Sequence, residues 1–171
     1  MPFALDVLSD ILAGNASSRF DKNLVRGKQT ALNAGTHYDI ISREMPLFSV
    51  IAMPAEGVKT DTLIAQLRQE IKDIADNGVS EEELQRVKTQ AAVSEIYAKD
   101  SMSSQASMMG RLEARGFQYT DEQEIHRRLQ AVSAQEVQAA ARMLTDERMS
   151  TVIIEPQKPA AAPSKKAAKR R

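Results

Sequence analysis

The chain has 171 residues, and its 23 Lys and Arg balance its 23 Asp and Glu to a formal net charge of zero. The charge is unevenly distributed: residues 157–171 carry +6 with no acidic side chain, so residues 1–156 carry −6. About 155 residues are enough for one domain with a hydrophobic core. The absence of cysteine excludes disulfides, thiolate zinc sites and cysteine nucleophiles.

Two short helices are predicted first. Apolar side chains recur at helical spacing over residues 3–12, and Gly14 is typical of a helix end. Ser18, or its neighbour Ser17, can cap a second helix over residues 24–26.

Two strands are predicted next, because apolar and polar residues alternate over residues 31–39 and 47–53. The link between them ends in Pro46, which favours a hairpin-like antiparallel pair. A third strand is predicted at Ser150–Ile154, a β-branched run ended by Pro156.

Helical spacing dominates from Thr60 to Gly78 and again after Ser80. Three capping boxes are predicted to open helices: Ser80 with Glu83, Thr120 with Gln123, and Ser133 with Glu136. The Ser- and Met-rich residues 100–110 leave two alternatives open, a break or a helical continuation that ends by Gly116.

These elements predict an α+β fold, with a small mostly antiparallel sheet and helices packed on one face. Three strands are few for so many helices, so we expect a further strand upstream of residue 1. The folded unit is predicted to span residues 1–156. Residues 157–171, rich in Ala, Pro, Lys and Arg, are predicted to be a disordered basic tail.

Two sequence blocks resemble the pitrilysin-type zinc peptidases, the superfamily of insulin-degrading enzyme and the mitochondrial processing peptidase. Residues 4–26, which contain Ser17-Ser18-Arg19-Phe20, resemble the family's "L-x-x-I-L-G-G-x-x-S-S-R-L…L-R" block. Residues 78–88 resemble its "G-V-T-x-x-E-L-x-x-A-K" helix start. The order and spacing of the two blocks also match, and the resemblance covers about residues 3–156.

The resemblance implies one of the two α/β units that enclose an unfolded peptide. One unit of the family binds zinc through H-x-x-E-H, and the other completes the substrate chamber. Here the only histidines are His37 and His126, too far apart to form that motif. The chain therefore resembles the C-terminal part of the non-catalytic unit of a bacterial member. We expect it to hold no zinc, to be inactive alone, and to pair with a zinc-bearing half in the same polypeptide or in a separate subunit.

Arg26 is the one predicted substrate-binding residue. It matches the Arg of the family's "L-R-x-x-x-x-L-A-Y" segment, whose Arg and Tyr help to bind or polarise the substrate carbonyl. The Tyr position falls on Leu32 or Asn33, and neither side chain has a phenol. The resemblance therefore supports peptide binding, through backbone pairing at a strand edge, more than it supports an oxyanion role.

Other candidate residues each have a structural alternative. Glu122 and His126 share a helical face, as metal ligands or as a surface i,i+4 pair. His37 either faces a groove or is a solvated strand residue. The cluster of Met102, Met108 and Met109 suits an adaptable binding surface or an ordinary core.

The sequence thus leaves two functions open. The first is a non-catalytic substrate-chamber domain of a zinc-dependent peptidase. The second is a non-enzymatic interaction or scaffold module. It would either resemble the structural members of the same superfamily or dock an anionic partner through its basic tail. Nucleic acid is disfavoured as a partner, because the tail lacks aromatic residues and the body is acidic.

The sequence also leaves the cellular compartment of the protein open. No apolar run approaches the roughly 18 residues of a membrane span, and the N-terminal residues do not resemble a signal peptide. A periplasmic or cell-envelope location fits a bacterial parent, whose signal peptide is expected outside this chain.

Overall fold

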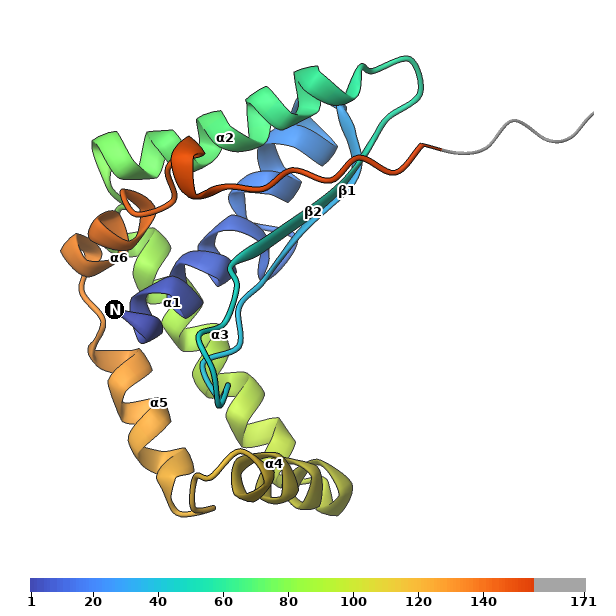
Figure 1. Cartoon of the computed structure of the whole chain (residues 1–171). Coiled ribbons are helices and arrows are strands. Elements are labelled where there is room, and N and C mark those ends of the chain that lie inside the picture. Colours follow the sequence, from blue (N-terminus) through green and yellow to red (C-terminus); the bar gives the residue numbers. More distant parts are fainter. Residues whose placement is uncertain (156–171) are drawn as a thin grey trace, which may run out of the picture.

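The computed structural model describes residues 1–155, so the predicted basic tail lies outside the described residues. The elements in chain order are α1 (Pro2–Ala13), the π-helix η1 (Asp21–Gly27), β1 (Ala31–His37), β2 (Ser49–Pro54), α2 (Thr60–Asn77), α3 (Glu81–Lys99), α4 (Met102–Ala114), α5 (Asp121–Ala131), α6 (Ala134–Ala141) and the 3-10 turn η2 (Asp146–Arg148). Figure 1 shows α4 at the end of the molecule opposite α2, with the sheet beside α1. This is the predicted α+β class.

The two strands form an antiparallel pair, as predicted from their alternation. Thr36 lies opposite Val50 and faces α1, where its hydroxyl donates a hydrogen bond to the backbone oxygen of Ser9 at 2.9 Å. The Ser9 hydroxyl in turn donates to Thr36 Oγ1 at 2.8 Å. The buried residues of α1 thus pack on one face of the sheet, whereas Ile51 and Met53 on the other face are exposed.

The core forms around α1. Leu8 and Leu12 are 0% exposed, as are Phe20 before η1 and Leu24 within it. The predicted stripe of α2 is buried in the same cluster, together with residues of α3 and α6. Burial of a large aliphatic or aromatic side chain contributes about 1.5–3 kcal/mol, so α1 and the segment that follows it organise the domain.

The predicted third strand is wrong. Residues 150–154 form no strand and no helix, and Val152 and Ile154 are 84% and 91% exposed. β-branched residues favour a strand only where a neighbouring strand accepts their backbone hydrogen bonds. Within residues 1–155, β1 and β2 pair only with each other.

The open alternative at residues 100–110 resolves as a break. α3 ends at Lys99, and α4 begins after Ser101, whose hydroxyl accepts from the Ser104 N–H at 3.3 Å. Gly116 follows the end of α4 with φ +86°, and the Phe117 N–H bonds the Leu112 carbonyl at 3.0 Å. The prediction that helical structure ends by Gly116 is confirmed.

The predicted caps of Thr120 and Ser18 do not form. Thr120 makes no capping hydrogen bond at the start of α5; instead Asp121 Oδ2 accepts from the Gln118 N–H at 2.9 Å. Ser18 does not cap η1, because its hydroxyl donates to the Asp10 carbonyl at the end of α1. The box of Ser133 with Glu136 is present in full.

Candidate functional site

Arg26 lies in the last turn of η1, where it makes two polar contacts. Its guanidinium donates to the Ala16 carbonyl, and its Nε lies 3.2 Å from Asp21 Oδ2. The side chain remains 58% exposed. Both contacts fix Arg26 beside the loop that joins α1 to η1, and neither reaches Leu32 or Asn33.

The two residues at the family's Tyr position lie at an irregularity of β1. The register of the sheet shifts between Ala31 and Asn33, which leaves Leu32 60% exposed. Asn33 lies opposite Met53. Neither side chain supplies a phenolic hydroxyl near Arg26, so the structure assembles no Arg–Tyr pair for an oxyanion from these positions.

The face of the sheet turned away from α1 presents apolar side chains to solvent. We call this the open face and define it by Asn33, Gly35, Ile51 and Met53, which alternate with the residues that face α1. Ile51 is 69% exposed and Met53 is 52% exposed. Adjacent exposed apolar side chains on a sheet are typical of a surface that contacts another chain.

A polar region elsewhere on the surface is a hollow of about 440 Å³, lined by Ser17, Lys22, Arg26, Gly27 and Arg86. We call it the cationic hollow, because three of its five lining residues are basic. Its residues come from the α1–η1 loop, from η1 and from α3. The three basic residues thus meet although Arg86 lies far along the chain from the other two.

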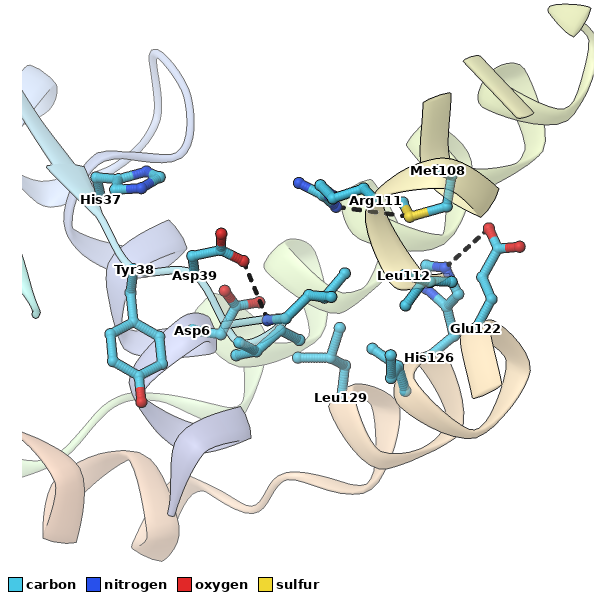
Figure 2. Close-up of a pocket in the computed structure, with 13 residues that line it drawn as sticks. Asp6, His37, Tyr38, Asp39, Met108, Arg111, Leu112, Glu122, His126 and Leu129 are labelled. Atoms are coloured by element: carbon cyan, nitrogen blue, oxygen red, sulfur yellow. Dashed lines mark hydrogen bonds and ion pairs between the residues drawn. The ribbon is translucent and has the colours of Figure 1, made fainter. Parts of the chain in front are cut away.

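The two histidines line one cavity of about 220 Å³ between α1, the end of β1, α4 and α5. Figure 2 shows His37 at the strand side of this histidine cavity and His126, with Glu122, at the side of α5. His126 Nε2 lies 3.8 Å from Glu122 Oε1, and its Nδ1 lies 3.3 Å from Glu95 Oε2. The interpretation of Glu122 and His126 as an i,i+4 pair is therefore confirmed.

The cavity does not fit a zinc ion. Among residues 1–155, no three His, Cys, Asp or Glu side chains are grouped so that they could hold a metal. Structural zinc requires four ligands and catalytic zinc three, each within about 2.3 Å of the metal. The His126 nitrogens are instead close to carboxylates.

Asp6 is the most perturbed acid of this cavity. Burial of its carboxyl, together with the nearby charges of Asp10 and Asp39, raises the pKa of Asp6 to about 7. Asp39 itself is bonded by Arg115, which also donates to the Ile41 carbonyl at 2.8 Å. Figure 2 shows Asp6 and Asp39 close together in the cavity. The Asp39 carboxylate is therefore paired with Arg115, whereas the pKa of the neighbouring Asp6 is raised.

One ion pair that joins distant segments was not predicted from the sequence. Arg19, in the first resembling block, forms a bidentate pair with Glu83, in the second, at 2.9 Å and 2.8 Å. The Arg19 guanidinium also lies 3.4 Å from the Gly78 carbonyl. Glu83 was expected to complete a capping box, but only the Ser80 half forms. The two sequence blocks are thus joined by one half-buried ion pair.

A family model described as "Peptidase M16 inactive domain" matches residues 2–91. The chain belongs to this family. The match confirms the resemblance to pitrilysin-type peptidases and includes both residues of the Arg19–Glu83 pair. A comparison with curated proteins finds no match.

Solved structures share the fold. The inactive peptidase domain of a "putative zinc protease" from Bordetella parapertussis is 21% identical with a TM-score of 0.78, covering 95% of this chain and 88% of that one. A "putative zinc protease" from Bordetella pertussis Tohama I is 20% identical with a TM-score of 0.68, covering 82% and 78%. A protease from Helicobacter pylori is 19% identical with a TM-score of 0.73 over 83% of this chain. The chain spans 34% of the length of that protease.

None of the helices within residues 1–155 combines the length and the apolar character of a membrane span.

Proposed function

We propose that this domain forms the non-catalytic wall of a zinc peptidase chamber and binds unfolded peptide on its open face. The observation that carries the proposal is the exposure of Ile51 and Met53 on a sheet whose opposite face is packed on α1. An extended peptide buries alternate side chains against such a surface and can pair with a strand edge. Membership of the inactive-domain family supports the same role.

The catalytic zinc belongs, in this proposal, to a partner half that carries H-x-x-E-H. This chain lacks the motif, because its two histidines are His37 and His126. Its contribution is to bind and orient the peptide, which lowers the entropic cost of the reaction in the partner's site. The purified chain is expected to cleave no unfolded peptide with or without added zinc.

The pairing is tested by mixing the chain with its zinc-bearing half. We expect association at micromolar concentration, measured by analytical ultracentrifugation, and peptide cleavage by the mixture alone. Metal-dependent cleavage by this chain alone would refute the assignment of a non-catalytic domain. Failure of the two halves to associate would refute the pairing.

A matched pair of methionine variants tests the open face. Met53→Glu places a charge on the open face, whereas Met102→Glu places one at the start of α4, where Met102 is 88% exposed. We expect Met53→Glu to weaken the binding of a neutral unfolded peptide about fivefold or more, and Met102→Glu to leave it unchanged. Equal effects of the two substitutions would exclude the open face as the binding surface.

Arg26 is proposed as a substrate contact of the assembled peptidase. Its exposure leaves the guanidinium accessible although Ala16 and Asp21 hold it. Arg26→Ala is expected to lower peptide turnover by the complete enzyme. Wild-type kinetics would remove Arg26 from the substrate-binding residues.

A further inference from the structure

The basic side chains of the cationic hollow are incompletely neutralised. Arg26 has Asp21 as its partner at 3.2 Å. Within residues 1–155, neither Lys22 nor Arg86 has an acidic group within 4.0 Å. Three cations and one carboxylate leave a surplus of about two positive charges, in a body whose residues 1–156 carry −6.

Arg19 shows the contrasting case in the same region. Its guanidinium is matched by the carboxylate of Glu83 and is only 21% exposed, so it serves to join elements. Arg86 instead reaches across to the loop before η1, where its Nη2 lies 3.4 Å from the Ser17 carbonyl. It is held near the hollow without being neutralised.

Like charges gathered in this way destabilise the folded protein. Lys22 and Arg26 lie about one turn apart on η1, where repulsion costs a few tenths of a kcal/mol. An anion placed among them removes this cost and accepts charge-assisted hydrogen bonds. The planar guanidinium groups of Arg26 and Arg86 match a carboxylate in geometry, because each can donate two parallel N–H bonds.

We propose that the cationic hollow binds a carboxylate group of the peptide, so that the domain selects acidic peptides. This inference rests on the proposed peptide-binding function and specifies the substrate class. A hollow of about 440 Å³ lies within the range of small-ligand sites and is larger than a single carboxylate requires. It therefore accommodates either a peptide C-terminus or an Asp or Glu side chain with part of its backbone.

The contacts of Arg26 with Ala16 and Asp21, and of Arg86 with Ser17, support this inference in a second way. They restrict both long side chains before any ligand arrives. Ordering a long flexible side chain costs about 0.5–1.5 kcal/mol on binding. Side chains that are already restricted therefore lose less conformational entropy when they bind an anion. Lys22 supplies the third charge from η1.

The test measures binding of labelled peptides to the full chain by fluorescence anisotropy, at low and at moderate salt. Four peptides share one apolar sequence and differ at two places. The central residue is Gln or Glu, and the C-terminus is an amide or a free acid, in all four combinations. We expect the acidic peptides to bind about three- to tenfold more tightly than the neutral one at low salt, with a smaller difference as salt screens the charges. If only the free acid binds more tightly, the bound carboxylate is that of the peptide C-terminus. If only the Glu peptide binds more tightly, it is that of the Glu side chain.

Three single substitutions locate the effect. Lys22→Gln and Arg86→Gln are each expected to abolish most of the preference for acidic peptides. Lys59→Gln, which removes an exposed cation before α2 outside the hollow, is expected to keep it. Equal affinity of the wild type for acidic and neutral peptides would overturn the inference and leave the proposed function intact. Equal loss in all three variants would also overturn it, and absence of any peptide binding would count against the proposed function itself.

Discussion

Replacement of Asp6 by asparagine is expected to stabilise the protein above neutral pH. The pKa of Asp6 rises from 3.8 to about 7 on folding, mainly because the carboxyl is buried. Between these values the native state keeps a proton that the unfolded state has lost, so stability falls as pH rises from about 4 to about 7. Above that range the whole penalty for burying the charge remains. Asparagine has nearly the same shape and no charge, so it removes the penalty.

The magnitude follows from the shift. About three pKa units correspond to a ceiling of about 4 kcal/mol. Asp6 is only half-buried and opens onto the histidine cavity, so solvent screening reduces the expected gain to about 1–2 kcal/mol at pH 8. For a domain of this size that gain raises Tm by about 3–6 °C. At pH 4 the gain should vanish.

The assay is thermal unfolding followed by circular dichroism at pH 4, 6 and 8. The charges of Asp10 and Asp39 contribute to the raised pKa of Asp6, so the difference between variant and wild type includes the relief of their repulsion. Glu56→Gln, in the exposed turn after β2, is the control and should change Tm equally at all three values. An Asp6→Asn variant with the wild-type Tm at pH 8, or one that gains stability only at pH 4, would refute this account of the cavity.

Three further predictions concern stability and are measured by urea denaturation. Leu8→Ala removes a side chain that is 0% exposed and should cost about 2–5 kcal/mol; a loss below about 1 kcal/mol would contradict its central place in the core. Arg19→Ala should cost about 1–3 kcal/mol because it leaves the Glu83 carboxylate unpaired, and a double-mutant cycle with Glu83→Gln in which the effects simply add would exclude the pairing. Gly78→Ala should cost about 1–3 kcal/mol, because Gly78 has φ +76° in a region that side chains disfavour. Gly110→Ala, at an open helical position in α4, should instead be neutral or stabilise by up to about 1 kcal/mol, and equal losses at both glycines would contradict the role of φ.

The helices were predictable because their signals are local. Apolar spacing placed α1 and α2, and Ser133 with Glu136 marked the start of α6, since a helix satisfies its own backbone hydrogen bonds. The break between α3 and α4 remained undecided from sequence alone. Ser101 is a good cap, but the surrounding residues tolerate a continuous helix equally well.

The strand that was predicted at residues 150–154, but does not form, shows where local signals fail. Its β-branched composition is favourable, yet a strand needs a neighbour from elsewhere in the chain. The pairing of residues 31–37 with 49–54 was predictable, because two alternating patterns follow each other in the chain with only residues 38–48 between them.

The candidate sites depended even more on distant contacts. Sequence resemblance singled out Arg26, but not the meeting of Arg26 with Arg86, or of His37 with His126 in one cavity. It found the two blocks that contain Arg19 and Glu83, but not the ion pair between them, which joins residues 64 positions apart.

The sequence by itself therefore determined the fold class, most helices, the family and the absence of the zinc motif. These properties are encoded in local spacing and in residue identity. Only the tertiary structure decided which face of the sheet is open, where unneutralised cations gather, and which acid is buried with a raised pKa. Such properties arise from groups distant in the chain, and packing alone sets their distances and their exposure to water.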